Sequence, residues 1–117
     1  MVKVVVLLTR QEGMSREAFA RYWREQHLPL VAKLPGMRRL IANYVLPDPN
    51  GSPPPHDGVA EDWFDDLTAM GVAFESPEGQ VVFADAATFL DMSQLQILVV
   101  EEEEIPLPVG APAASAD

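Results

Sequence analysis

The sequence predicts one α+β domain whose elements run strand, helix, strand, strand, helix, strand. Three observations support this prediction. β-branched runs stand near both ends, helix-like segments lie between strand-like segments in each half, and the composition is 48% hydrophobic and 22% charged, as in ordinary globular proteins. A chain of 117 residues can build one hydrophobic core but not two. We therefore expect one domain over residues 1–104 and a proline- and alanine-rich tail over 105–117.

The first strand is expected at residues 2–9, where VKVVVLLT is apolar on both alternating faces. A strand with two apolar faces needs other parts of the protein packed against both of them. The helix that follows should begin at Ser15, a good N-cap, and bury Phe19, Tyr22 and Trp23, which recur with the 3.6-residue period.

Proline and glycine predict the breaks between helical segments. Pro29 should end or kink the first helix near His27, because proline disfavours helical geometry in the preceding residue, and a short second piece should start at Pro29. The second long helical region is expected over residues 65–90. It should be interrupted near Gly71 and restart at Ser76, where Ser-Pro-Glu supplies an N-cap and a proline at the first helical position.

Three further strands are expected at residues 37–46, 59–64 and 94–101, and the proline-rich segment 47–57 should form a long loop. This order gives a ferredoxin-like βαββαβ plan, a four-stranded antiparallel sheet with the helices on one face. The first and last strands are apolar on both faces, so the uncovered face needs a partner. We expect a second copy of the chain to supply it, which makes the protein a homodimer.

Composition excludes several classes of partner. Eight basic and eighteen acidic residues give a net charge of −10, which repels nucleic acid and anionic membranes, and no apolar run approaches the ~20 residues of a membrane helix. The chain has no cysteine, and His27 and His56 have no second ligand at metal-binding spacing. We expect a cytoplasmic protein without a metal site, in which His56 is a solvated loop residue.

The segment most informative about chemistry is FARYWREQHLPLVAKLPG, residues 19–36. His27 follows Trp23 by four residues and Phe19 by eight, so its imidazole shares their inward face near a helix end. Desolvation by the aromatic side chains lowers its pKa while the helix end raises it, which leaves the sign open. A titratable group on an apolar face is a candidate acid or base, although a histidine at this place often only hydrogen-bonds the last carbonyls of its helix.

Three motifs in this segment resemble the EthD family, named for ethyl tert-butyl ether degradation: Tyr22-Trp23, His27-Leu28-Pro29-Leu30 and Leu34-Pro35-Gly36. The resemblance continues in shorter motifs almost to the tail: Asn43-Tyr44, Asp57-Gly58, Trp63-Phe64, Ser76-Pro77-Glu78, Ala84-Asp85 and Val99-Val100-Glu101. It implies a dimeric α+β barrel. Some relatives are similar to cofactor-free lyases, isomerases, decarboxylases or polyketide cyclases, and many have no assigned activity.

The leading hypothesis is a cofactor-independent lyase, isomerase or decarboxylase that acts on a small apolar or aromatic carbonyl compound, with His27 as general acid/base. Seven side chains are expected around the ligand: Tyr22, Asn43 and Tyr44 as hydrogen-bonding groups, Phe19, Trp23 and Trp63 as an apolar wall, and Asp85 in the cleft. The alternative for the aromatic residues is plain core packing, and for Asp85 a solvated helix face.

Two rival functions stay open at this point. The first is a non-catalytic accessory or binding module that stores a small hydrophobic compound in the same cavity. The second is haem binding, which rests on analogy between folds alone.

Overall fold

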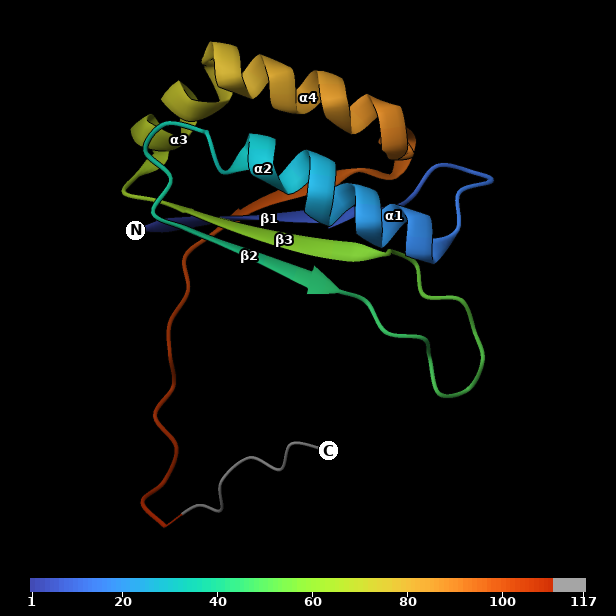
Figure 1. Cartoon of the computed structure of the whole chain (residues 1–117). Helices are drawn as coiled ribbons and strands as arrows, with labels where there is room; N and C mark the ends of the chain where they lie inside the picture. Colours follow the sequence, from blue (N-terminus) through green and yellow to red (C-terminus); the bar gives the residue numbers. More distant parts are fainter. Residues whose placement is uncertain (111–117) are drawn as a thin grey trace.

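The computed structural model describes residues 1–110 (Figure 1), so the end of the expected tail, residues 111–117, lies outside the described part of the chain. The elements follow the predicted strand and helix order. They are β1 (Val2–Leu8), α1 (Arg16–Tyr22), the π-helical turn η1 (Trp23–His27), α2 (Leu28–Val31), β2 (Arg39–Tyr44), β3 (Gly58–Phe64), α3 (Leu67–Glu75), α4 (Pro77–Phe89), the 3₁₀ turn η2 (Met92–Gln94) and β4 (Gln96–Val100).

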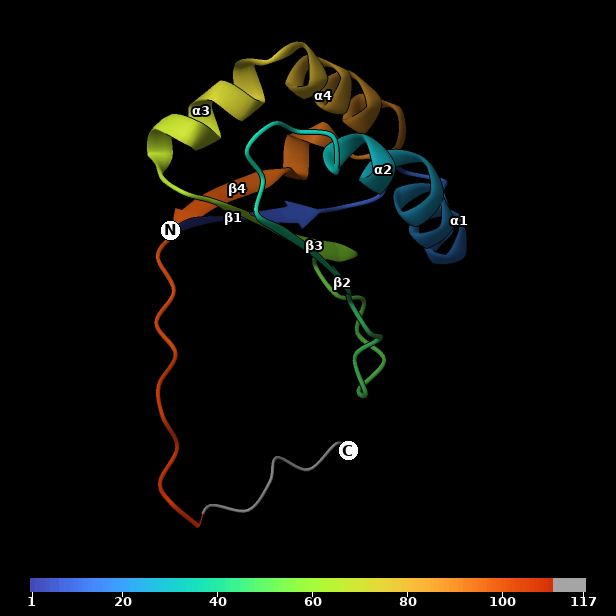
Figure 2. The same cartoon turned by 60° about the vertical axis from the view of Figure 1, so that its left-hand side comes forward.

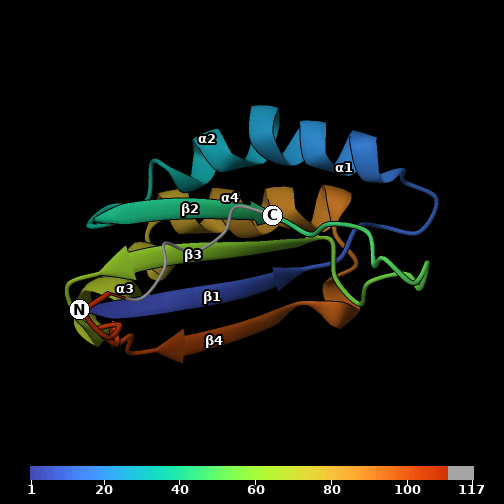
Figure 3. The same ribbon diagram turned by 90° about the horizontal axis from the view of Figure 1, so that it is seen from below.

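The four strands form one antiparallel sheet in the order β2-β3-β1-β4, which Figure 3 shows from its open side. The helices lie together on the other face (Figures 1 and 2). The predicted ferredoxin-like α+β fold is therefore confirmed, with a sheet that stays open rather than closing on itself. No helix among the described residues is long and apolar enough to cross a membrane.

The helix type changes at His27, close to the predicted end or kink, and the short helix α2 begins at Leu28, one residue before the predicted start at Pro29. The chain nevertheless stays helical through Pro29. Pro29 has no N–H to donate, and in an α-helix its ring collides with the carbonyl four residues back. The chain accommodates the proline by a wide turn, in which the Leu28 N–H donates to the Trp23 carbonyl five residues earlier. Trp23 and His27, at the two ends of this turn, are both buried against the sheet.

The predicted interruption near Gly71 is wrong, because α3 runs through that glycine unbroken. One glycine costs a helix only about 1 kcal/mol, too little to break a segment that packs well. The chain turns only at Ser76, whose Oγ accepts the Gly79 N–H and caps α4 as predicted.

Two hydrophobic clusters fill the space between sheet and helices. One contains Phe19 and Trp23 with the end of α4, and the other contains Val4 and Phe64 with α3. The Trp23 indole packs directly on Gly58 of β3, where a Cβ atom would lie 2.8 Å from the ring, so this position excludes any larger side chain. Tight packing at the start of β3 therefore fixes how the wide turn sits on the sheet.

Alternate strand residues build the open face. Trp63 lies between Arg39 and Lys3 in one cross-strand row, and both cations lie over its ring. The Trp63 Nε1 donates to Glu102 Oε1 at 2.7 Å, which covers the ring further. The neighbouring row includes Leu98, which is 52% exposed, so apolar surface remains uncovered on this face.

Candidate functional site

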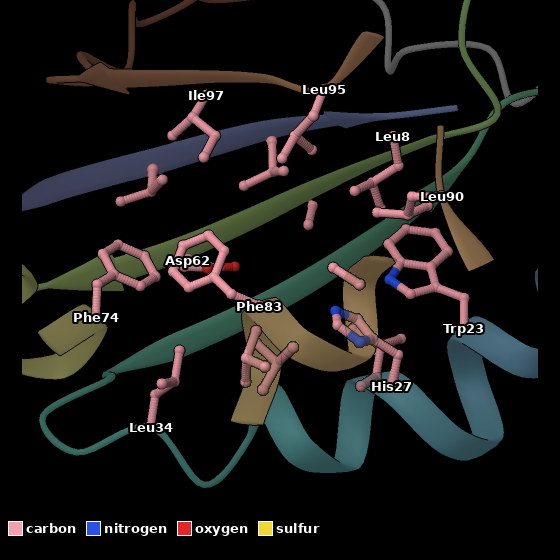
Figure 4. Close-up of a pocket in the computed structure, with 17 residues that line it drawn as sticks. Leu8, Trp23, His27, Leu34, Asp62, Phe74, Phe83, Leu90, Leu95 and Ile97 are labelled. Atoms are coloured by element: carbon pink, nitrogen blue, oxygen red, sulfur yellow. The ribbon is translucent and has the colours of Figure 1, made fainter. Parts of the chain in front are cut away.

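A cavity of about 60 Å³ lies between the helices and the sheet (Figure 4). Its walls are apolar side chains of β1, β3, β4, α2, α3 and α4, and among residues 1–110 the only ionisable ones that line it are His27 and Asp62. Phe83 of α4 and Ile97 of β4 also line it and are 39% and 46% exposed, so the cavity opens between these two elements. The volume suits a few water molecules and is far below that of a haem.

His27 comes from the end of the wide turn and is 5% exposed. Its Nδ1 lies 2.8 Å from Oδ2 of Asp85 on α4, and the other oxygen of that carboxylate accepts the Tyr22 hydroxyl at 2.7 Å. The Phe89 ring centroid lies 4.9 Å from that of the imidazole. The imidazole is thus fixed by a carboxylate on one side and by an aromatic ring.

The surroundings of His27 give the direction of its pKa shift, which the sequence left open. Burial lowers the pKa of His27, while the hydrogen bond and charge of Asp85 act in the opposite direction. A neutral imidazole next to a carboxylate that can only accept must carry its hydrogen on Nδ1. Nε2 is then the basic nitrogen, available to a molecule in the cavity.

Asp62 is the site residue that the sequence reasoning missed. It lies in the middle of β3, is 4% exposed, and its Oδ1 has no hydrogen-bond partner among residues 1–110. Burial raises the pKa of Asp62 to about 7. The strand period carried the signal, because Asp62 alternates with Ala60 and Phe64, and all three side chains face the helices.

Trp23 is the predicted wall residue that lines this cavity together with His27. Phe19 and Tyr44 pack on the Trp23 indole, with ring centroids 5.6 and 5.1 Å away, and do not line it. Tyr22 lies behind the imidazole as a partner of Asp85. Phe19, Tyr22 and Tyr44 therefore contribute to the site mainly through their packing and hydrogen bonds around it. Trp23 and His27 are the side chains that reach the cavity.

Asn43 and Trp63 lie on the open face of the sheet and do not reach the cavity. Asn43 Nδ2 donates to Glu61 Oε1 at 3.0 Å. The Trp63 ring is covered by Lys3 and Arg39, and its Nε1 donates to Glu102. Neighbouring residues of a strand point to opposite faces, so Asn43 and Tyr44 cannot serve the same cavity.

The proline-rich loop is attached to the end of β1. His56, expected to be solvated, is half-buried, and its Nδ1 lies 3.0 Å from Thr9 Oγ1. Asp57 is buried and accepts hydrogen bonds from the backbone N–H and the guanidinium of Arg10. Asp57 thus has a charged partner, whereas Asp62 has none in the range 1–110.

Comparison with known proteins gives one matching family and several similar structures. The model described as the EthD domain matches residues 11–93. A relative from Rhodococcus erythropolis, described as an uncharacterized 11.0 kDa protein in the thcB-thcC intergenic region, is 33% identical over 89 residues, 76% of this chain and 85% of the relative.

Two solved structures illustrate the structural likeness. An ethyl tert-butyl ether degradation (EthD) family protein from Bacillus halodurans C-125 has a TM-score of 0.74 and 28% identity, covering 88% of this chain and 99% of its own. A dimeric protein of unknown function with a ferredoxin-like fold, from Bacteroides fragilis, has a TM-score of 0.64 and 17% identity, covering 86% and 95%. The second likeness shows the fold alone.

Proposed function

The chain belongs to the EthD family, and from this premise we propose that it moves a proton on a small apolar carbonyl compound without a cofactor. His27 is the general acid/base. One observation carries the proposal: a buried imidazole, held at Nδ1 by Asp85, borders an otherwise apolar cavity.

The arrangement meets the requirements of a general base. A base needs a fixed orientation, a free acceptor nitrogen and a pKa that leaves it unprotonated near neutral pH. Asp85 supplies the orientation, the tautomer supplies the nitrogen, and burial lowers the pKa. In this function Trp23 forms part of the apolar wall, and Tyr22 and Asp85 are positioning residues.

The test follows α-proton exchange of a small ketone into D₂O. Cyclopentanone is the probe, because a compact ketone can place its carbonyl group in the cavity and extend through the opening beside Phe83 and Ile97. NMR would show exchange catalysed by the wild-type protein and lost in His27→Gln. His56→Gln is the matched control, because that histidine lies in the proline-rich loop, and it should exchange at the wild-type rate. Equal rates in wild type and His27→Gln would remove the catalytic role.

The binding module remains the second candidate, because an apolar cavity can retain a hydrophobic molecule without changing it. The same experiment separates the two. Saturable binding of the ketone by NMR, with no exchange above the His27→Gln background, would assign storage or transport instead of catalysis.

We also propose that two chains pair through their open sheet faces. The Bacteroides fragilis protein of the same fold is described as dimeric. Here Leu98 on the open face is 52% exposed, and the segment after β4 extends away from the body of the chain, with Ile105 and Leu107 largely exposed (Figure 2). A partner sheet would cover these apolar groups. The cytoplasmic location expected from the sequence stays a prediction.

A further inference from the structure

We propose that Asp62 is the second proton-bearing group of this cavity and makes it selective for neutral carbonyl compounds. The inference rests on the proposed function and deepens it. Asp62 would donate a hydrogen bond to the carbonyl oxygen of the ligand while His27 acts on the adjacent C–H.

The first support is position. Asp62 projects from the sheet and His27 from the helical layer above it, and both line the same cavity (Figure 4). In the sheet, Asp62 pairs with Val4 on one side and Leu40 on the other, so its strand neighbours offer it no polar side chain. A ligand between the two layers would therefore meet one polar group on each side.

The second support is the missing partner. A buried carboxylate is costly unless it is paired, and Asp57 shows the usual solution by binding Arg10. Asp62 has no such cation, and its Oδ1 has no hydrogen-bond partner among the described residues. Under these conditions the neutral carboxylic acid is the favoured form. Unlike a carboxylate, that form carries an O–H that can donate to a carbonyl oxygen.

The chemistry balances without an added reactant. Nε2 of His27 takes a proton from the carbon next to the carbonyl, and the C–H electron pair forms a carbon–carbon double bond. The carbonyl oxygen takes the proton of Asp62, which gives an enol, an imidazolium and a carboxylate. In the return step Asp62 recovers its proton from the enol O–H, and His27 delivers its proton to carbon, at the original or at a conjugated position.

The residues that line the cavity also determine which ligand charge it can accept. Within the described part of the chain, no lysine or arginine lines the cavity. An anionic substrate would therefore bury a charge without compensation, close to a residue that can itself become negative. Neutral ketones and aldehydes fit these walls, whereas carboxylates, including the substrates of a decarboxylase, do not.

Binding and exchange measurements with three related probes test the assignment. Cyclopentanone is the neutral carbonyl, cyclopentane lacks the oxygen, and cyclopentanecarboxylate carries the charge. We expect the wild type to bind the ketone at least ten-fold more tightly than the other two. The infrared carbonyl band of the bound ketone should shift to lower frequency.

Two substitutions of Asp62 separate its role as a hydrogen-bond donor from its role as a source of a proton. Asp62→Asn keeps a hydrogen-bond donor but has no acidic proton, so ketone affinity should stay within about three-fold while exchange falls about 100-fold or more. Asp62→Leu removes the donor, so the carbonyl band of the bound ketone should not shift and the preference over cyclopentane should vanish. Circular dichroism melting of each variant checks that it is folded.

The outcomes distinguish this inference from the function on which it rests. Exchange that needs His27 but is unchanged in both Asp62 variants would overturn the role of Asp62 and leave the proposed function standing. A wild type that shows no exchange, yet a band shift that disappears in Asp62→Leu, would remove the proposed function and support Asp62 as the ligand's hydrogen-bond donor. Tight binding of the carboxylate probe would overturn the selectivity.

Discussion

The imidazole of His27 and the carboxylate of Asp85 meet at 2.8 Å although they are 58 residues apart in the sequence. This contact joins the wide turn to α4 and holds the imidazole at the edge of the cavity with Nδ1 toward Asp85. We predict that Asp85→Ala lowers the exchange rate about ten- to 100-fold while the ketone still binds. The pKa of His27 should fall further, because the raising influence of Asp85 is lost.

Nitrogen-15 NMR of the imidazole measures both the tautomer and the pKa in that variant. Thr88→Ala is the control, since the Thr88 hydroxyl contacts Tyr22 but not His27. An Asp85→Ala protein with the wild-type rate and tautomer would show that this contact is structural only.

The pH dependence of exchange should be bell-shaped. The rate requires neutral His27, whose pKa lies below its ordinary 6.5, and protonated Asp62, whose pKa is about 7. The rate should therefore rise with pH on the acid side of 6.5 and fall as the pH passes about 7. Asp62→Asn should lose the alkaline fall. Rates of cyclopentanone exchange across the neutral range check this, and a single plateau at high pH in the wild type would contradict it.

Asp62 should make stability depend on pH. Its pKa is raised from 3.8 to about 7 on folding, so its favourable contribution is complete below pH 3.8 and is lost as the pH rises to about 7. Asp62→Asn should therefore raise the free energy of unfolding by about 2–4 kcal/mol in mildly alkaline buffer, and by little in acid. Denaturant titrations at two pH values measure the difference.

Asp57→Asn is the matched comparison for that experiment. It removes the charge that binds Arg10, so it should lower the free energy of unfolding by about 1–3 kcal/mol. If both substitutions destabilise the protein equally in alkaline buffer, Asp62 has a partner that the described residues do not include.

Pairing through the open sheet face can be tested with one charge. Leu98→Lys places a charge on that face, where Leu98 is 52% exposed, and should weaken self-association at least ten-fold. Val81→Lys is the control, because Val81 lies on the helical side and is similarly exposed at 51%. Sedimentation velocity measures both. A wild type that stays monomeric at high concentration would contradict the dimer.

The sequence predicted the fold because the relevant signals are local. The β-branched run at residues 2–8, the Ser15 N-cap and the Ser76 N-cap each specify an element through its own side chains. Gly71 misled the prediction because glycine only weakens a helix, and neighbouring packing decides whether the helix breaks. The wide turn could not be foreseen either, since Pro29 can end a helix or widen it.

The candidate site was only partly predictable. The spacing from Phe19 through Trp23 placed His27 inward, and the structure has it there. The pairing of His27 with Asp85 depends on how α4 lies over the first helical segment, which no local pattern specifies. Asp62 was missed for a different reason: acidic side chains are usually exposed, although its alternation with Ala60 and Phe64 points it inward.

The wide turn also keeps the first helical segment in phase with the sheet. An α-helix advances about 100° per residue, so side chains four residues apart drift by about 40° at each step. Three such steps from Phe19 to Val31 would rotate the last side chain off the sheet. The π turn has more residues per turn, so each residue rotates less and the drift is partly reversed. As a result, all four residues of this series are buried: Phe19, Trp23, His27 and Val31. The proline that interrupts regular hydrogen bonding therefore keeps the imidazole in register with the aromatic stripe.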